Sequence, residues 1–454
     1  MFRAESIPGS PRERRSTTGE HIRTWGASLY STSSAELEQP GWRKLSRDCC
    51  VSTSISSSGW LALATPVEVR LYPADHRNRK IKLDITIKPK LRSKEEIRSV
   101  SLSEDLLTLV THRRLIVYEY RVPGRVEEYL VHDRLFDQRQ DYGLNPTVTD
   151  GRKGRKHKAS RTHDQDETWI PKSVSVIQIG STSALIAVGG EGVNGVKLYR
   201  YSYHTGWNPQ GDPCNLKCLR NNGSVRLVGF SPCRYNRANR FMVFGVTTSN
   251  RVHCWDMRTR PSGSLSIESD WDIDCTARTN EPPHRGEITS ASIFLSPASR
   301  PYIFCTVNQK NGSQLLRSFV APIAFGQSSE ESRWQTLESV MDREVLSGAA
   351  TANGLFLVAV EAGKLKLLTL QGVYGGLTCL ARTQDAPLSL AGLAISVKVE
   401  EIEEDIKVTA IDGRGKIVFA TFRVKGMPAP EAPPVEIPPV FEAGSPDIGE
   451  LASS

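Results

Sequence analysis

One pattern recurs seven times along the chain and constrains the fold more than any other feature. Each copy contains an apolar strand, a turn of small residues, a second apolar strand, a tight turn and a third strand that ends in aromatic or aliphatic residues. The copies begin at Val51, Ile97, Ser173, Ser224, Glu287, Val345 and Leu388. Their starts lie 43 to 76 residues apart, near the roughly 40 to 45 residues of a four-stranded repeat unit with insertions. The recurrence predicts a closed ring of small sheets.

The second strand of each copy is a nearly continuous apolar run, such as LALAT, LIAVGG, FMVFGV and FLVAV. Such runs are typical of strands that are covered on both faces. A weaker fourth strand follows several copies, as in KIKLDITIK from Lys80, VEEYLVHDRLF from Val126 and LTCLARTQD from Leu377. The chain is therefore expected to be all-β, a seven-bladed β-propeller. The alternative is a pair of β-sandwiches built from the same hairpins.

The seventh copy has no fourth strand of its own. After Val424 the chain becomes rich in proline, which cannot donate to a strand ladder. The segment from Trp42 to Cys50, directly before the first copy, is expected to pair there, so that an N-terminal strand completes the last blade. This places the propeller at residues 42–424, between a basic, Ser/Thr-rich tail (1–41) and a proline-rich acidic tail (425–454), both expected to be disordered.

Several residues in these copies resemble the WD-repeat (WD40) β-propellers. Trp255-Asp256 stands where that family has its signature dipeptide, His284 precedes a first strand as the family's histidine does, and Asp412 falls at a position like its turn aspartate. Only one Trp-Asp is in register, so the chain resembles a degenerate member. The resemblance implies a scaffold that presents loops to protein partners, with blades held by apolar packing in place of the family's polar network.

Composition argues against membrane and secreted classes. There is no run of 18 apolar residues and no apolar N-terminal core of a signal peptide. Nine cysteines, an odd and scattered set, argue against a disulfide framework. Cys214 and Cys218, with Cys233 and His204 nearby, do not supply the paired ligands of a zinc site. An intracellular protein, cytoplasmic or nuclear, without a membrane segment or cofactor is expected.

The net charge of +8 gathers in particular segments. The insertion at residues 138–168 is basic, because the stretch from Arg152 to Arg161 contains six cations and no acidic residue. The cations are Arg152, Lys153, Arg155, Lys156, Lys158 and Arg161. Such a cluster can be a solvated loop, a nuclear import signal or a site for an anionic partner. The segment HRNRKIKLDITIKPKLRSK from His76 forms a second basic patch, and Arg113-Arg114 is expected to be a hairpin turn with solvated arginines.

The C-terminal tail has five acidic residues and no basic residue after Lys425. It is expected to be extended, with a PxxP spacing at Pro430 and Pro433 and apolar anchors at Val435 and Phe441 that suit a groove on a partner. The alternative is an unbound spacer.

Enzyme motifs are missing from the sequence. It contains no Gly-x-Ser-x-Gly, no P-loop and no His-Glu-x-x-His. The sequence favours a non-catalytic protein–protein interaction scaffold or adaptor, monomeric within an intracellular complex, with no catalytic, cofactor-binding or metal residues. The second hypothesis is a nuclear or RNA-associated propeller whose basic insertion binds phosphate backbones. A hydrolase or isomerase with a site in the central channel, which residues such as Ser52, Ser101, Ser224 and Ser347 would line, is the third.

Overall fold

The computed structural model of the 454-residue chain describes the residues that form its strands and the turns between many of them. These are residues 26–38, 50–73, 78–122, 125–127, 169–179, 183–191, 195–202, 206–207, 214–216, 224–230, 240–259, 265–274, 287–295, 301–308, 316–322, 335–336, 345–361, 363–369, 378–383 and 395–426.

The described residues form thirty strands in seven sheets, which we number I to VII in chain order. Sheet I contains β2 (Ser52–Ile55), β3 (Trp60–Ala64), β4 (Val69–Pro73) and β6 (Ile85–Ile87). Sheet II contains β7 (Ile97–Leu102), β8 (Leu106–Thr111), β9 (Leu115–Val122) and β10 (Arg125–Glu127). Sheet III contains β11 (Ile170–Ile179), β12 (Ser183–Glu191), β13 (Val196–Ser202), β14 (Gly206–Trp207) and β15 (Cys214–Leu216).

The remaining sheets follow the same plan. Sheet IV contains β16 (Val225–Phe230), β17 (Arg240–Thr247), β18 (Arg251–Thr259) and β19 (Leu265–Asp274). Sheet V contains β20 (Glu287–Leu295), β21 (Pro301–Asn308), β22 (Leu316–Pro322) and β23 (Gln335–Thr336). Sheet VI contains β24 (Val345–Ala350), β25 (Phe356–Glu361), β26 (Lys364–Thr369) and β27 (Thr378–Arg382). Sheet VII contains β28 (Ser396–Ile402), β29 (Asp405–Ile411), β30 (Lys416–Lys425), β1 (Gly26–Leu37) and β5 (Lys80–Ile81).

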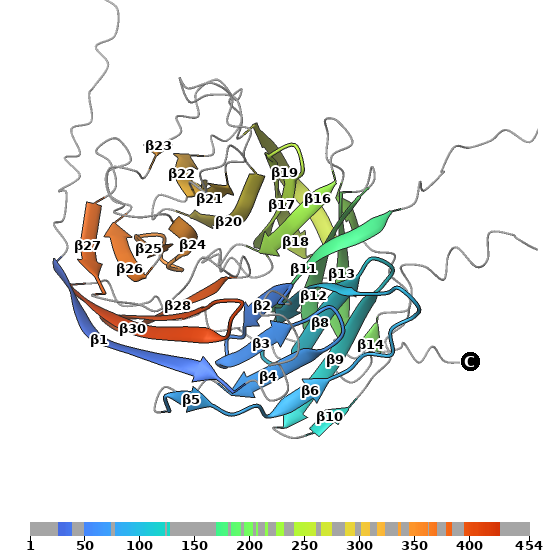
Figure 1. Ribbon diagram of the computed structural model, residues 1–454. Helices are drawn as coiled ribbons and strands as arrows, with labels where there is room; N and C mark the ends of the chain where they lie inside the picture. The colour runs from blue at the N-terminus through green and yellow to red at the C-terminus, as the bar shows by residue number, and fades with distance from the viewer. Residues whose placement is uncertain are drawn as a thin grey trace, which may run out of the picture.

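Neighbouring sheets contact each other through their first strands. Each of β2, β7, β11, β16, β20 and β24 contacts the first strand of the next sheet, and β28 of sheet VII also contacts β2 of sheet I. Figure 1 shows the sheets succeeding one another about a common centre. The expectation of an all-β chain with a repeated multi-stranded sheet is confirmed.

Serine side chains on the first strands bridge the sheets. Ser52 Oγ accepts a hydrogen bond from the Val100 amide at 3.1 Å, and Ser101 Oγ accepts one from the Val176 amide at 3.1 Å. The first strand of each sheet has an edge without a ladder partner, so its neighbour's amides would otherwise lack acceptors. The small polar residues of these strands therefore join sheet I to sheet II and sheet II to sheet III.

The strand that completes sheet VII differs from the expected one. β1 pairs with β30 in an antiparallel ladder that runs from Gly26↔Lys425 to Glu36↔Lys416. An N-terminal strand thus does complete the last sheet, but it lies at residues 26–37, inside the tail expected to be disordered, while residues 42–49 lie outside the described set. The error arose because β1, GASLYSTSSAEL, has a mostly exposed face of serine and threonine and lacks an apolar run.

The segment KIKLDITIK was expected to be one fourth strand and is divided between two sheets. β5 pairs in parallel with the end of β1 in sheet VII, whereas β6 pairs with β4 in sheet I. This division links the first and last sheets, because the connection from β4 to β6 passes the edge of β1. The Tyr72 hydroxyl also donates to the Glu38 carbonyl oxygen at 3.1 Å.

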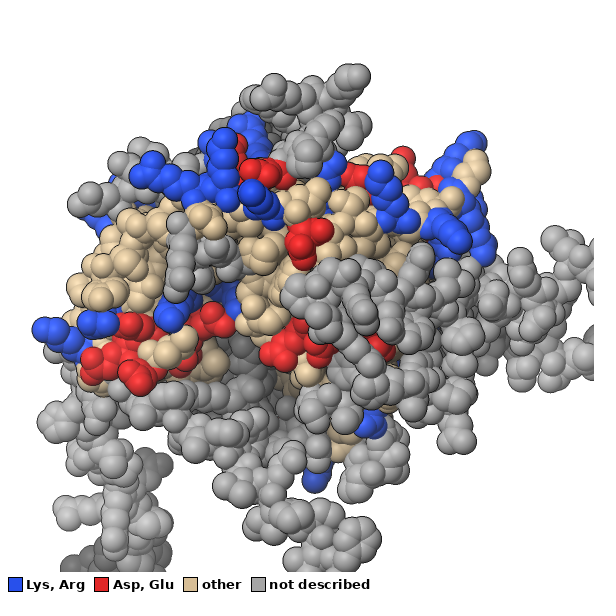
Figure 2. All heavy atoms as spheres, turned by 90° about the horizontal axis from the view of Figure 1, so that it is seen from below, with Lys and Arg blue, Asp and Glu red and all other residues tan. Residues whose placement is uncertain are grey.

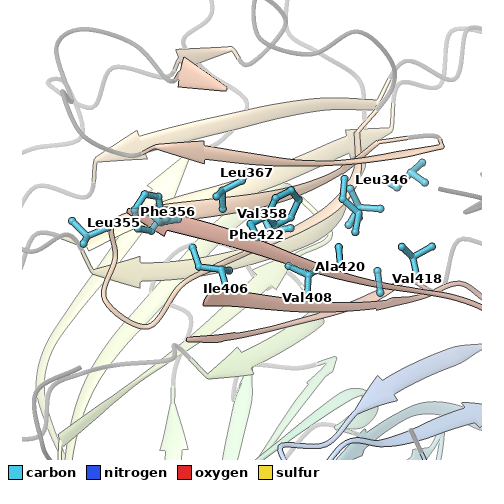
Figure 3. Packing of buried hydrophobic residues seen from close by; sticks show 14 residues of the cluster. Leu346, Leu355, Phe356, Val358, Leu367, Ile406, Val408, Val418, Ala420 and Phe422 are labelled. Atoms are coloured by element: carbon cyan, nitrogen blue, oxygen red, sulfur yellow. The ribbon is translucent and has the colours of Figure 1, made fainter. Parts of the chain in front are cut away.

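Six apolar clusters fill the spaces between neighbouring sheets. Figure 3 shows the one between sheets VI and VII, where Phe356 and Val358 of β25 face Ile406 of β29 and Phe422 of β30. The second strands are buried on both faces, as in β25, all six of whose residues are buried. Cys254 and Cys305 pack within the cluster between sheets IV and V, as expected of small apolar residues.

The third strands are largely buried although their sequences include charged residues, as in β4 and β26. Their charged residues form ion pairs inside the sheets: Arg70 with Glu68 at 2.7 Å in sheet I and Lys366 with Glu361 at 3.0 Å in sheet VI. Both members of the second pair have side chains at most 2 % exposed. A cation on a third strand therefore does not indicate a solvated face in this fold.

None of the described residues forms a helix of the length and apolarity needed to cross a membrane.

Candidate functional site

The connections between strands lie at two opposite ends of each sheet. Successive strands are antiparallel, so the hairpins that join second to third strands share one end with the connections that lead into each first strand. We call this end the hairpin face, and the end with the turns between first and second strands the turn face. The Ile97 amide donates to the Pro66 carbonyl oxygen at 2.8 Å, which places the hairpin of sheet I beside the start of β7.

A side-chain oxygen at the end of the second strand holds many of these hairpins. Thr65, Thr111 and Thr247 each accept hydrogen bonds from backbone amides of their own turn. In sheet VII the same position is Asp412, whose Oδ1 accepts from the amides of Arg414 and Lys416, each at 2.9 Å. The expectation that Asp412 is a turn residue is confirmed, and threonine has the same role in three other sheets.

A buried carboxylate joins two backbone segments, the connection into β7 and the hairpin of sheet II, at the hairpin face of sheets I and II. Glu95, in the connection between β6 and β7, accepts hydrogen bonds from Arg114 Nε at 2.7 Å, from the Thr111 hydroxyl at 2.6 Å and from the Arg92 amide at 2.7 Å. Arg114 also donates to the Lys90 carbonyl oxygen. Burial opposes ionisation of Glu95, but these donors outweigh it and hold its pKa below the ordinary value.

This network corrects one sequence expectation. Arg113 is exposed, as expected of a hairpin arginine, but the Arg114 side chain is 8 % exposed and paired with a carboxylate that is fully buried. Arg114 thus fixes the connection to the hairpin and leaves its neighbour on the surface. Sequence spacing could not reveal this, because Glu95 lies nineteen residues before Arg114.

The fixed segments carry exposed cations. We define the basic surface as the side chains that are exposed around the Glu95 network: Lys88, Lys90, Arg92, Lys94 and Arg113. Of the nearby carboxylates, Glu95 is engaged inside the network, Glu68 pairs with Arg70 at 2.7 Å and with Lys88 at 3.7 Å, and Glu96 is exposed. In Figure 2 many Lys and Arg side chains lie along the upper edge of the face shown. The basic surface therefore has a local excess of positive charge.

His112 lies next to this surface. Its pKa is lowered, first by partial burial and then by the positive charges of Arg113 and Arg98. Its Nε2 accepts a hydrogen bond from Arg113 Nε at 3.1 Å, which requires the neutral imidazole. His112 thus adds an acceptor and no charge to the surface near neutral pH.

The turn face has the opposite charge in sheets II and VII. Glu104, in the turn between β7 and β8, and Glu403 and Glu404, in the turn between β28 and β29, are exposed. Asp405 pairs with Arg423 at 2.8 Å. Figure 2 shows a group of acidic side chains in its lower left part, with Lys and Arg side chains beside it. Exposed carboxylates thus gather at the turn face of sheets II and VII.

The residues that the sequence singled out fall into two groups. Trp255 and Asp256 lie within β18 and are buried, Trp255 in the cluster between sheets III and IV. The others lie outside the described residues: His284, the six cations of the basic insertion, and Pro430, Pro433, Val435 and Phe441 of the tail.

The serines proposed to line a channel have structural partners in several cases. Ser52 and Ser101 accept amides from the next sheet, and Ser347 Oγ lies 3.3 Å from Ser290 Oγ. Within the described part of the chain, no group of three or more His, Cys, Asp or Glu residues is arranged to hold a metal ion.

Comparison with known proteins finds similarity among solved structures but not among family models or curated proteins. No protein-family model matches the chain, and no curated protein matches it. Among solved structures, it is similar to the WD40 domain of coronin from Toxoplasma gondii, with a TM-score of 0.46 and 10% identity over 89% of this chain and 87% of that chain. A functionally unknown protein from Desulfotomaculum acetoxidans has a TM-score of 0.39 and 10% identity over 77% of this chain and 90% of that chain. With TM-scores below 0.5, neither similarity adds to the fold described above.

Proposed function

We propose that the chain is a closed seven-bladed β-propeller of the WD40 type and that it acts as a non-catalytic interaction scaffold in an intracellular complex, as a monomer. The contact of β28 with β2 supports the closed ring, since it joins the first sheet to the last. Ser396 Oγ donates to the Thr53 carbonyl oxygen at 2.8 Å, and Lys398 Nζ donates to the Ser57 carbonyl oxygen at 2.6 Å across the same junction.

The partner that suits the hairpin face is an acidic protein segment. The single observation that carries this proposal is the Glu95 network, which holds the backbone between Lys90 and Glu95 against the hairpin of sheet II and so fixes the segment from which the exposed cations project. A preformed surface loses less conformational entropy on binding than a mobile one. Complementary charge also accelerates association and makes it sensitive to salt. The proline-rich segment with Pro430, Pro433, Val435 and Phe441 is a second proposed docking point, for a groove on a partner.

The test is binding of a fluorescein-labelled poly-glutamate peptide to the full chain at several salt concentrations. Replacing Lys90, Arg92 and Lys94 by Gln is expected to weaken binding about tenfold or more and to flatten its salt dependence. The matched control replaces Lys80, Lys82 and Lys407 by Gln, exposed residues outside the basic surface, and is expected to leave binding within about twofold. Equal loss in both variants would contradict the proposed site.

The same measurement with single-stranded poly(U) distinguishes the protein-binding scaffold from the second hypothesis, an RNA-associated propeller. Tight, steeply salt-dependent binding of poly(U) that disappears when residues 151–161 are deleted would instead support an RNA-associated propeller. Binding of poly-glutamate that persists when residues 151–161 are deleted would support the protein-binding scaffold.

A further inference from the structure

Five consecutive sheets have a β-bulge at the same place. In each, one extra residue is inserted near the start of the first strand, opposite the end of the second strand. The inserted residues are Arg98, Lys172, Arg226, Thr289 and Leu346. Bulges redirect side chains and are frequent beside functional sites. Three of the five redirected residues are cations, and they occupy consecutive sheets, II, III and IV.

The three bulge cations all lie at the hairpin face. Arg98 is exposed and close enough to His112, in the hairpin of sheet II, to lower its pKa. Lys172 Nζ lies 3.1 Å from Glu191 Oε2, at the end of β12. Arg226 Nη2 donates to Asn250 Oδ1, in the hairpin of sheet IV, at 3.1 Å. Arg98 and Arg226 thus approach the hairpins of their own sheets, and Lys172 approaches the end of the second strand of sheet III.

The strands that carry these cations are direct neighbours. The Ser99 hydroxyl accepts a hydrogen bond from the Val174 amide at 3.3 Å, so the residue after Arg98 is tied to β11 just beyond Lys172. Between sheets III and IV, a Cβ built on Gly189 would lie 2.6 Å from Ser173 Oγ and 2.8 Å from Val225 Cγ1. Ser173 follows Lys172 and Val225 precedes Arg226, so the two bulges flank one seam. We call the three residues Arg98, Lys172 and Arg226 the cation arc.

Two hydroxyl groups beside the arc are available to a ligand. Ser173 is 5% exposed, and its Oγ has no hydrogen-bond partner among the described residues, although Ser99, at the same place in sheet II, accepts an amide. Ser224 Oγ, two residues before Arg226, is also buried without a partner in the described part of the chain. A buried hydroxyl without a partner is unfavourable. Both hydroxyls could donate to an anion held at the seam.

Partial burial adds to the effect of Arg226. Burial alone lowers the pKa of this guanidinium to about 10, which leaves it fully charged at neutral pH. One carboxylate, Glu191, pairs with Lys172 and is itself exposed. A charge in a partly desolvated position interacts more strongly with an anion than the same charge in water.

We propose that the cation arc, with Ser173 and Ser224, binds the phosphate group of a phosphorylated side chain on a protein partner. This inference rests on the proposed scaffold function and specifies the chemistry that it recognises. A phosphate monoester carries about −1.5 to −2 charges at neutral pH and three acceptor oxygens. Two guanidinium groups, an ammonium group and two hydroxyls on neighbouring strands suit that charge and that number of acceptors better than a single carboxylate.

The test uses the full chain and degenerate peptide libraries with a fixed central phosphoserine, serine or glutamate. The phosphoserine library is expected to be retained about tenfold more strongly than the serine library. Replacement of Arg98, Lys172 and Arg226 by Gln is expected to abolish this preference. The matched control replaces Lys80, Lys82 and Lys407 by Gln, which removes the same charge from exposed positions outside both the cation arc and the basic surface, and is expected to keep the preference.

Three further measurements give the experiment defined outcomes. Thermal unfolding shows whether each triple variant is folded. The single variants Ser173→Ala and Ser224→Ala leave the net charge unchanged and are expected to weaken phosphoserine binding several-fold. Equal retention of all three libraries by the wild type, or equal loss in both triple variants, would overturn the phosphate site. Binding to vesicles that contain phosphatidylinositol 4-phosphate, without phosphopeptide binding, would also overturn it. Loss of poly-glutamate binding when Lys90, Arg92 and Lys94 are replaced by Gln would still support the proposed function if the phosphate site failed.

Discussion

At the scale of single residues, polar side chains at the strand ends have more specific roles than their types suggest. Glu95 joins two backbone segments, Asp412 holds a hairpin, and serines of the first strands bridge sheets. The apolar clusters stabilise the sheets without preference for one loop geometry. The polar residues supply that preference at the hairpin face.

Glu95→Gln is expected to lower the free energy of unfolding by about 3 kcal/mol at pH 7, because it leaves the buried Arg114 without its counter-charge. Urea unfolding measures the change, and Glu96→Gln, an exposed neighbour, is the control. A loss below about 0.5 kcal/mol would contradict the structural role of the pair.

The same pair predicts a pH dependence. The pKa of Glu95 is lower in the folded protein than the ordinary value of 4.5. Its stabilisation is therefore complete above pH 4.5 and is lost as the pH falls through the lower pKa of the folded state. Wild-type stability should fall more steeply in this acid range than that of Glu95→Gln. Parallel curves from urea unfolding at several pH values would contradict this assignment.

Gly348→Ala is expected to destabilise the contact between sheets V and VI by about 2 kcal/mol. A Cβ at this position would lie 2.6 Å from the Phe304 ring and 3.0 Å from the Val358 carbonyl oxygen, which cannot move freely. Gly245→Ala is the matched control, because its Cβ would meet only side-chain atoms, the closest at 3.1 Å. Thermal unfolding of both variants compares the two sites, and equal effects would show that the backbone oxygen is not decisive.

At the scale of strands, the sequence predicted the repeated elements well and the edge strands poorly. Copies that begin at Ile97, Glu287 and Val345 start at the observed first residues of β7, β20 and β24. Their buried apolar runs are a strong signal, since both faces of the strand are covered. β1 has no such run, and β5 and β6 are too short to show any alternation, so their pairing depends on neighbours that are distant in sequence.

Leu37→Ala tests the importance of β1 and is expected to lower stability by about 3 kcal/mol. Leu37 is 3% exposed and packs with Leu61 and Ile417 in the cluster between sheets VII and I. Ser34→Ala on the exposed side of β1 is the control and is expected to change stability by less than about 0.5 kcal/mol. Urea unfolding of both variants measures the change in the free energy of unfolding. Equal small effects would show that β1 adds little to the stability of the fold.

At the scale of the whole molecule, a closed ring predicts equal protection of all its innermost strands. Hydrogen exchange of β2 and β28 is expected to be as slow as that of β7 and β11, because no first strand is at an open end. Ser396→Ala removes one bridge across the junction, worth about 1 kcal/mol, and should accelerate exchange locally about fivefold. Fast exchange confined to β2 and β28 in the wild type would contradict closure.

The functional surfaces show where sequence reasoning ends. The basic character of residues 88–94 was visible in the sequence, but their fixed geometry depends on Glu95 and Arg114, which only the fold brings together. The cation arc could not be predicted, because Arg98, Lys172 and Arg226 share no motif. Only the pairing register shows that each is the inserted residue of a bulge.

The pairing of β1 with β30 also bears on how the protein is made. Of the described strands, the ribosome synthesises β1 first and its partner β30 last, so at about 5–20 residues per second the nascent strand waits roughly 20 to 80 seconds for β30. Until β30 is made, the backbone groups of β1 lack this ladder partner. The polar, serine-rich outer face of β1 then keeps the strand from binding other chains. The absence of an apolar run, which hid β1 in the sequence, thus suits this strand to a late docking step during biogenesis.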